Sequence, residues 1–386
     1  MHPELLARRC DYPILGRKTY LINNSLGAMH RDTPGRLAEF ARLWDENGVL
    51  AWNSWFPNMA RVADLVGRTI GAPAGSTILR ANVADVLVSV ASAIDFTGSR
   101  NAVVSTDLDW PGSHYLWQEY RRFGARPVVV TAASDGIHID VDRVCAAVDE
   151  HTALVAISLV TFRSSTLIDP RPIIDRAHAV GALVLLDAYQ GVGAVPIDVV
   201  DLDVDFCVGG SVKFLCGGPG NGWLYVRPAL AETLRPAAVG WISHAEPFAF
   251  ELDEIRYAPG VGRFAGGTPN VPAAYAAEPG YRAIVEIGVA AIRARSVSLT
   301  QPLLEDARSR GYLVGSPSDP AQRGGHVTLD IPEGVRVHDE LIRRDVVVDY
   351  RPGGGLRIAP HFFSTAEECT RVLDEIDAIC RQIGAR

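Results

Sequence analysis

Strand-like apolar runs alternate with helical stretches through the middle of this chain, and this alternation limits the possible folds more than any other feature. The runs are rich in β-branched residues, and between residues 101 and 226 they read NAVVST, RPVVVTA, ALVAISLV, ALVLLDA, DFCVGG and GWLYV. Helical stretches such as DRVCAAVDEH and RPIIDRAHAVG separate them. Such alternation indicates βαβ units. We therefore expect an α/β fold with a mostly parallel sheet and helices on both of its faces.

The segments on either side of this region complete the expected layout. Residues 34–70 read as helices joined by an aromatic loop, AWNSWFPN, and residues 231–270 form an irregular stretch rich in Pro and Gly. A helix is expected over residues 271–313, followed by a smaller α/β unit. The last helix should begin at a capping box formed by Ser364 and Glu367. Its buried stripe is expected to consist of Val372, Ile376, Ile379 and Ile383.

Length and charge exclude several classes of function. With 386 residues the chain is long enough for two domains, or for one large domain with a satellite. Its net charge of −8 argues against a nucleic-acid or anionic-membrane partner, because either one needs a basic patch. No apolar run approaches the length of a membrane span, and MHPELLARRC lacks an apolar signal core, so a cytoplasmic protein is expected. The six cysteines form no CxxC pair and no zinc-finger spacing, so no metal site is expected.

Lysine is nearly absent from this chain, which makes one lysine informative. Among 37 lysine and arginine residues only Lys18 and Lys213 are lysines, and Lys213 lies in the glycine-rich stretch GGSVKFLCGGPGNG. Asp187 ends the apolar run ALVLLD, and Gln190 follows shortly after it. In open α/β sheets, ligands bind at the carboxyl ends of the strands. We therefore expect Asp187, Gln190 and Lys213 to meet at that edge of the sheet.

These three residues suit pyridoxal 5′-phosphate (PLP). The cofactor needs a lysine for its Schiff base, because arginine does not deprotonate to form an imine. It needs a carboxylate beside the ring nitrogen, a role open to Asp187, and it benefits from a hydrogen bond to the ring oxygen, which Gln190 could donate. Taken singly, Asp187 could be a turn residue and Lys213 a solvated surface charge. Together they predict a PLP site.

A series of short blocks runs along nearly the whole chain. In order they read NNSLGA (23–28), DWPGSHY (109–115), LLDAYQ, DFCVGGSVKFLCGGPGNG, VGW, FAGGTPN and LRIAP. These blocks resemble those of the class V aminotransferase fold (fold type I PLP enzymes), in its kynureninase-like branch. The resemblance implies a homodimer with active sites shared across the interface and a small-molecule substrate, an amino acid. It implies an N-terminal segment packing with the small domain (1–50), a large PLP-binding domain (51–260) and a small C-terminal domain (261–386).

The resemblance also implies roles for individual residues. Lys213 matches the Schiff-base lysine, Asp187 the partner of the pyridinium nitrogen, and Gln190 the contact to the ring oxygen. Trp110 matches the aromatic plate that stacks on the cofactor. The remaining matches are the phosphate-binding helix start Asn82 and Val83, the phosphate donors Ser211 and Trp241, Thr268 as a donor from the neighbouring subunit, Arg357 as the clamp on the substrate α-carboxylate, and Ser25 as a substrate-binding residue.

Three positions depart from the kynureninase pattern. Kynureninases usually have His where this chain has Gln190, Tyr where it has Val212, and Asp where it has Ser113. The tyrosine serves proton transfer during hydrolysis of the γ-ketone, and valine can neither donate nor accept a proton. Cofactor binding is compatible with these changes, whereas hydrolysis of kynurenine is not favoured.

We therefore expect a kynureninase-like enzyme that acts on a β-substituted L-amino acid, such as a cysteine S-conjugate in secondary metabolism. It would cleave a C–S bond by β-elimination, or decarboxylate and oxidatively deaminate its substrate, and in this it resembles the kynureninase-like PLP enzymes of lincosamide antibiotic biosynthesis. Kynureninase itself, another class V reaction (aminotransferase, desulfurase or epimerase) and a retired enzyme acting as a binding or structural subunit are the alternatives. The retained Asp187, Gln190, Lys213 and Arg357 argue against the last of these.

Overall fold

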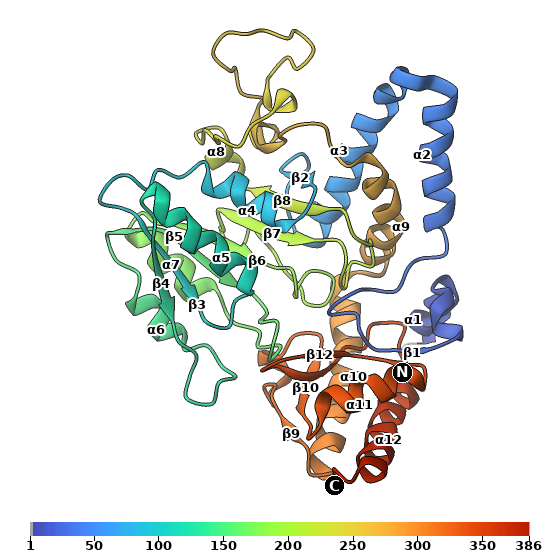
Figure 1. Cartoon of the computed structure of the whole chain (residues 1–386). Helices are drawn as coiled ribbons and strands as arrows, with labels where there is room; N and C mark the ends of the chain where they lie inside the picture. The colour runs from blue at the N-terminus through green and yellow to red at the C-terminus, as the bar shows by residue number, and fades with distance from the viewer. Residues whose placement is uncertain (1–2, 386) are drawn as a thin grey trace.

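A seven-stranded sheet forms the centre of the computed structural model, which describes residues 3–385 (Figure 1). Neighbouring strands run parallel except at β8, which is antiparallel to its neighbours β2 and β7. In spatial order the strands are β2 (Thr77–Arg80), β8 (Gly222–Val226), β7 (Phe206–Gly210), β6 (Leu183–Asp187), β5 (Thr152–Ser158), β3 (Ala102–Thr106) and β4 (Arg126–Val130). The expected mostly parallel α/β sheet is confirmed.

Helices cover both faces of this sheet, and the strand β5 shows why. Every residue of β5 is buried, and its side chains point to alternate faces. Val155 and Ile157 pack into the apolar core on the side of α3, α6 and α7, whereas Leu154 and Ala156 pack into the core on the side of α4 and α5. A strand buried on both faces reads as a continuous apolar run. The helices are α3 (Trp52–Thr69), α4 (Val83–Ala91), α5 (Pro111–Glu119), α6 (Val141–Ala146) and α7 (Arg171–Ala179).

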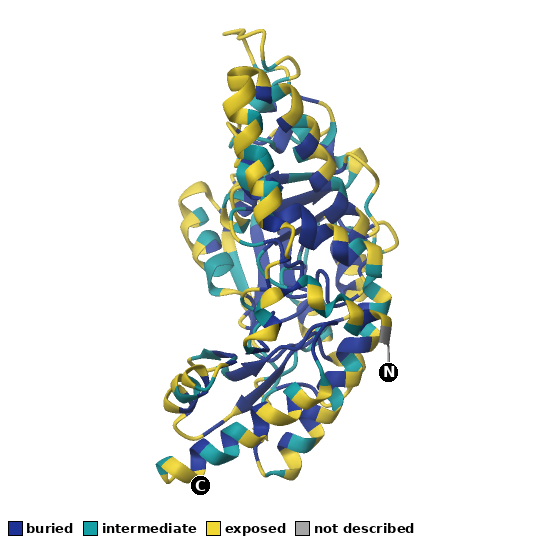
Figure 2. Cartoon of the chain, turned by 90° about the vertical axis from the view of Figure 1, so that its right-hand side faces the viewer, coloured by how far each residue is buried: buried dark blue, intermediate teal, exposed yellow. Residues whose placement is uncertain are grey.

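The C-terminal part of the chain builds a smaller unit with its own apolar core, below the sheet in Figure 1. A four-stranded antiparallel sheet lies in it, in the order β12 (Asp349–Arg351), β13 (Gly355–Ile358), β10 (Val327–Asp330) and β9 (Leu313–Val314). The helices of this unit are α10 (Val289–Ser309), α11 (Gly334–Arg343) and α12 (Ala366–Ile383). Figure 2 shows the strands of the molecule buried between helices whose outer surfaces are exposed.

The N-terminal segment contacts this smaller unit through a short parallel pair, β1 (Thr19–Tyr20) with β11 (Val346–Val347). The domain boundaries at residues 50 and 260 stay a prediction. The other helices are α1 (Pro3–Ala7), α2 (Thr33–Asn47), α8 (Pro228–Ala231) and α9 (Val271–Ile287). Short 3-10 helices are η1 (Arg8–Asp11), η2 (Pro13–Gly16), η3 (Gly48–Ala51), η4 (Tyr120–Phe123), η5 (Trp241–Ser243), η6 (Gly260–Phe264) and η7 (Pro320–Gln322).

Three local expectations were wrong. The aromatic stretch 51–58 is not a loop, because α3 begins at Trp52 and its aromatic side chains pack, with Trp55 stacked on Phe40 at 5.2 Å. The helix expected over 271–313 is two helices, because Gly288 adopts φ +83° between α9 and α10, a backbone conformation that interrupts a helix. The capping box lies one residue later than expected, since Thr365 Oγ1 accepts from Glu368 N at 3.2 Å.

Among the residues that the structure describes, no helix combines the length and the apolar character that crossing a membrane requires.

Candidate active site

A cavity of about 280 Å³ lies at the carboxyl ends of β5 and β6, where the smaller unit and the N-terminal segment meet the sheet. Several residues predicted from the sequence share it, in agreement with the rule that ligands bind at this edge of a parallel sheet. The lining residues are Asn24, Ser25, Val83, Trp110, Ser158, Val160, Phe162, Asp187, Tyr189, Gln190, Lys213, Arg351 and Arg357.

Asp187 and Lys213 bring opposite charges into this cavity. Asp187 is the last residue of β6, and its Oδ1 accepts a hydrogen bond from Tyr189 N at 2.9 Å. Burial raises the pKa of Asp187, while the Tyr189 N–H and the charge of Lys213 oppose that rise. Burial also lowers the pKa of Lys213, and Asp187 opposes this shift. Low dielectric disfavours the charged form of each group, so the amine is closer to its neutral, nucleophilic form than a surface lysine.

Two aromatic rings flank the amine. Lys213 Nζ lies 4.1 Å from the ring centroid of Tyr189 and 6.0 Å from that of Trp110. The Tyr189 ring fits only because residue 210 is glycine, since a Cβ there would lie 2.3 Å from the phenol oxygen. Burial raises the pKa of Tyr189 to about 12, so its phenol keeps its proton at neutral pH. Tyr189 therefore offers a proton donor next to Lys213.

Gln190 and Asn24 contribute polar atoms without partners. Gln190 Nε2 donates to the main-chain carbonyl of Asn24 at 3.2 Å, and Gln190 Oε1 is buried without a hydrogen-bond partner. Asn24 lines the same cavity, and neither Nδ2 nor Oδ1 of its side chain has a partner. Buried polar groups in native proteins are nearly always hydrogen-bonded. These atoms are therefore placed to contact a bound ligand.

Arg357 reaches the cavity wall from β13, but its guanidinium is already engaged. Its Nη1 donates to the carbonyl of Phe162 at 2.5 Å, and its Nη2 pairs with Asp349 Oδ2. The other oxygen of Asp349 lies 3.3 Å from Arg351 Nη1, so one buried carboxylate joins two arginines. Arg351 is the more exposed of the two, and its Nη2 lies 3.5 Å from Ser25 Oγ.

Of the remaining predicted cofactor contacts, Val83 lines the cavity, whereas Asn82, Ser211, Trp241 and Thr268 lie outside its lining. Asn82 caps the start of α4, with Oδ1 accepting from Asp85 N at 3.0 Å, and the next residue, Val83, lines the cavity. Ser211 is fully buried, and its hydroxyl is 3.2 Å from the Asn221 carbonyl.

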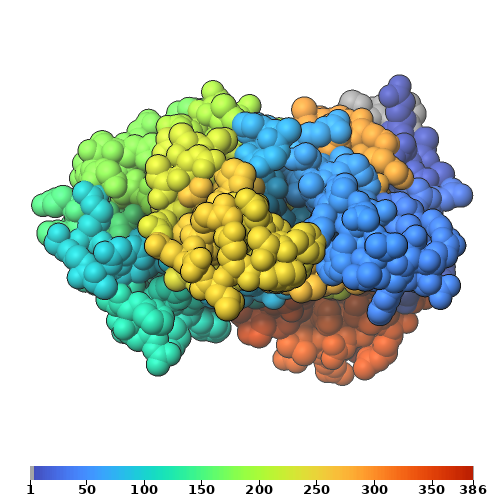
Figure 3. All heavy atoms as spheres, turned by 90° about the horizontal axis from the view of Figure 1, so that it is seen from above, coloured from blue at the N-terminus to red at the C-terminus, as the bar shows by residue number. Residues whose placement is uncertain are grey.

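Trp241 and Thr268 contact each other, with Trp241 Nε1 donating to Thr268 Oγ1 at 3.3 Å. Neither residue lines the cavity. They lie near the protruding segment after η5 that Figure 3 shows beside the N-terminal helices, where Phe56 packs on Trp241 and Phe248 at 6.1 and 6.3 Å.

The cavity fits PLP in its chemistry. A half-buried amine, a half-buried carboxylate, an unpaired amide oxygen on Gln190 and the flat ring of Trp110 meet within one small space. The start of α4 reaches the lining at Val83, and helix starts bind phosphate through their free N–H groups. The roles of the individual residues stay predictions.

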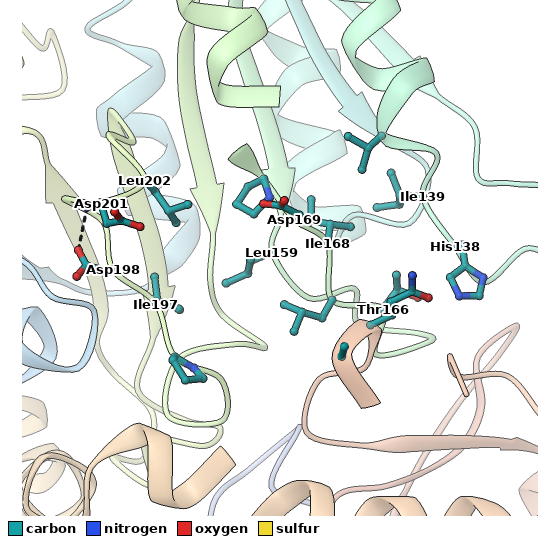
Figure 4. Close-up of a pocket in the computed structure, with 16 residues that line it drawn as sticks. His138, Ile139, Leu159, Thr166, Ile168, Asp169, Ile197, Asp198, Asp201 and Leu202 are labelled. Carbon is teal, nitrogen blue, oxygen red and sulfur yellow. Dashed lines mark hydrogen bonds between the residues drawn. The ribbon is translucent and has the colours of Figure 1, made fainter. Parts of the chain in front are cut away.

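Figure 4 shows another cavity, of about 790 Å³, between the segments that follow β5 and β6. Two of its acidic side chains accept hydrogen bonds from main-chain N–H groups in their own turns. Asp198 Oδ1 accepts from Asp201 N at 2.9 Å, and Asp169 Oδ1 accepts from Arg171 N at 3.1 Å. None of the residues predicted to act in catalysis lines it. Within residues 3–385 no group of three His, Cys, Asp or Glu side chains is placed to hold a metal ion.

Six of the residues that line the cavity were not predicted from the sequence: Asn24, Ser158, Val160, Phe162, Tyr189 and Arg351. Tyr189 could have been found, because it lies between Asp187 and Gln190 in LLDAYQ. Arg351 is one of many arginines in this chain, and only its position in the fold marks it as a residue of the cavity.

The family model described as Aminotransferase class-V matches residues 58–344. The uncharacterized aminotransferase YcbU of Bacillus subtilis (strain 168) is 30% identical over 311 residues, which cover 81% of this chain and 81% of that protein. A kynureninase of Bacillus thuringiensis subsp. konkukian (strain 97-27) is 26% identical over 383 residues, covering 95% of this chain and 89% of the kynureninase.

The fold has close counterparts among solved structures. The apo structure of a cysteine desulfurase from Thermococcus onnurineus NA1 superposes with a TM-score of 0.86 at 20% identity, covering 98% of each chain. At this identity the likeness concerns the fold.

Proposed function

This chain belongs to the aminotransferase class-V family and is a PLP-dependent enzyme, and within that family we propose that it acts on a β-substituted L-amino acid and expels the β-substituent. The substrate class that we favour is a cysteine S-conjugate in secondary metabolism, with a thiolate as the leaving group. The observation that carries the proposal is the half-buried Lys213, whose amine shares a cavity with Asp187 and which directly follows Val212, a residue that cannot transfer protons.

Each residue would contribute one property to this reaction. PLP, when bound, supplies an electron sink that weakens the bonds at the α-carbon of an amino acid. Asp187 would stabilise a proton on the ring nitrogen, and the Lys213 amine would take the proton from the α-carbon, a task helped by its lowered pKa. Arg357 and Ser25 would hold the α-carboxylate, and Trp110 would shield one face of the ring. A thiolate is a stable anion and can leave without a general acid.

We propose that the protein works as a homodimer in the cytoplasm, with Thr268 reaching the cofactor phosphate of the neighbouring subunit. Trp241 is hydrogen-bonded to Thr268, so both residues would serve the same phosphate. Asn82, Val83 and Ser211 would hold the phosphate from within their own subunit.

Hydrolysis of kynurenine is the second candidate function. The phenol of Tyr189 lies beside Lys213 and could supply the proton transfer that Val212 does not. The kynureninase of B. thuringiensis, which aligns over 95% of this chain, supports the same candidate.

Product analysis by mass spectrometry separates the two functions. The holoenzyme is offered L-kynurenine, L-alanine and a panel of cysteine S-conjugates. We expect pyruvate and a free thiol from an S-conjugate, and negligible anthranilate from kynurenine. Rapid release of anthranilate and alanine would establish the second candidate instead.

The lysine is tested in the same experiment. Lys213→Ala should abolish turnover, and borohydride should fix the cofactor of the wild type to the peptide that contains Lys213. Lys18→Ala is the matched control, because Lys18 forms an exposed ion pair with Asp345. Cofactor fixed to the Lys18 peptide, or to none, would contradict the assignment.

A further inference from the structure

Asn24 is fully buried, lines the active-site cavity and has no hydrogen-bond partner for either polar atom of its side chain. The neighbouring Asn23 is equally buried, and its Nδ2 donates to the carbonyl of Ala359 at 2.9 Å, so only its Oδ1 lacks a partner. Leaving a buried amide unpaired destabilises a folded protein. The two free atoms of Asn24 therefore indicate a contact with a bound ligand, and the proposed mechanism gives Asn24 no such role.

The main chain fixes the place of Asn24. Its carbonyl accepts from Gln190 Nε2, and Gly27 N donates to the carbonyl of Val212 at 2.6 Å. Residue 27 can only be glycine here, since a Cβ would lie 2.2 Å from the Lys213 carbonyl. The turn that carries Asn24 is therefore packed directly against the lysine segment.

The surroundings of Asn24 identify the ligand. On one side lies Gln190, and on the other lies Ser25, whose hydroxyl is 3.5 Å from Arg351 Nη2. A carboxylate attracted by Arg351, Arg357 and Lys213 would enter the cavity beside the Asn24 side chain. Arg357 is only 2% exposed and is already bound to Asp349 and to the Phe162 carbonyl, so a neutral amide donor adds a contact that breaks neither.

We infer that Asn24 binds the α-amino-acid substrate, with Nδ2 donating to its α-carboxylate and Oδ1 accepting from its amino nitrogen. An α-amino acid carries both an anionic acceptor and an N–H donor, which matches the two free atoms of an amide. An aspartate at this position would repel the carboxylate. The inference rests on the proposed function, since it requires an amino acid in this cavity.

The test compares two ligands that differ only in the carboxylate. Binding of L-alanine and of L-alaninamide to the PLP-loaded enzyme is followed by the change in absorbance of the bound cofactor, so no turnover is needed. Asn24→Asp should weaken L-alanine binding about 10- to 100-fold, the loss expected for a hydrogen bond to a charged group. Asn24→Ala, which adds no charge, should also weaken L-alanine binding more than alaninamide binding. The PLP dissociation constant and the melting temperature of the apoenzyme are measured alongside.

The outcomes distinguish this inference from the proposed function. A wild type that binds no PLP, or binds PLP but not L-alanine, would overturn the proposed function. A wild type that binds both, with Asn24→Ala weakening both ligands equally or neither, would overturn the role of Asn24 alone. Weaker PLP binding with unchanged alanine binding would show that Asn24 contacts the cofactor instead, and would likewise overturn it.

Discussion

His361 Nε2 lies 2.8 Å from the main-chain carbonyl of Phe214, the residue that directly follows Lys213. Both side chains are buried, and their rings meet edge to face at 5.5 Å. Because His361 follows β13 of the smaller unit, this contact ties that unit to the segment carrying the lysine. The geometry assigns the proton of the neutral imidazole to Nε2. The tie is therefore made by an uncharged histidine.

Acid should weaken the fold through this histidine. Burial lowers the pKa of His361 from 6.5 to about 4, although the Phe214 carbonyl opposes the shift. Between these values the unfolded chain binds more protons than the folded one, so the free energy of unfolding rises with pH across this window. Acidification from pH 6.5 to 4 should lower the free energy of unfolding by about 3 kcal/mol through the protonation of His361.

The measurement is denaturant unfolding of wild type and His361→Gln between pH 4 and pH 7. Glutamine can donate to Phe214 without titrating, so its free energy of unfolding should fall less steeply on acidification. Other buried groups, such as His326, titrate in both proteins and cancel in the comparison. Parallel curves for the two proteins would show that His361 does not carry this sensitivity.

The sequence was sufficient for the sheet and for the centre of the site, because local pattern determines both. The apolar runs predicted the parallel strands, and the scarcity of lysine singled out Lys213. The surroundings of the lysine were not predictable in the same way. Asn24 and Arg351 come from opposite ends of the chain and meet the cavity only through tertiary packing. The engagement of Arg357 by Asp349 depends on strand pairing between β12 and β13, which no motif encodes.

Arg357 should both stabilise the fold and bind the substrate, and the two roles can be separated. Arg357→Ala leaves Asp349 buried with only Arg351 as counterion, so the free energy of unfolding should fall by about 3 kcal/mol. Combining it with Asp349→Asn removes the uncompensated charge and should restore most of the melting temperature.

If Arg357 clamps the α-carboxylate, the double variant should still show a KM raised at least about 30-fold, consistent with loss of a charge-assisted contact. Its affinity for PLP should stay within about threefold of the wild type, because phosphate and ring contacts are untouched. Recovery of the wild-type KM in the double variant would make Arg357 a residue of the fold only.

Thr268 should act across a subunit interface. Neither Thr268 nor Trp241, which donates a hydrogen bond to it, lines the cavity of its own chain. Thr268→Ala and Lys213→Ala are each expected to form weakly active or inactive dimers. Mixed and reassembled, they should regain activity, since a hybrid dimer contains one site with an intact lysine and an intact threonine from the other subunit. No recovery, or an active monomer in sedimentation, would place Thr268 in its own subunit's site.

Tyr189 provides the sharpest distinction between the two candidate reactions. Its phenol stays protonated at neutral pH, and its ring lies 4.1 Å from Lys213 Nζ. Departure of a thiolate needs no proton donor, so Tyr189→Phe should leave turnover of a cysteine S-conjugate within about threefold of the wild type. Hydrolysis of a γ-ketone needs proton transfer, and a general acid typically raises a reaction rate about 10²- to 10⁴-fold. Tyr189→Phe should therefore slow any hydrolysis of kynurenine by a factor in this range.

Steady-state kinetics of Tyr189→Phe on both substrates checks this expectation. Phenylalanine keeps the ring beside Lys213 and removes only the hydroxyl, so packing changes little. The bound-cofactor spectrum of the variant serves as the control for an intact site. A loss of 100-fold or more on the S-conjugate would mean that the phenol protonates the leaving group. In that case the sulfur would have to be protonated as it leaves, and Tyr189 would supply the proton transfer that Val212 cannot.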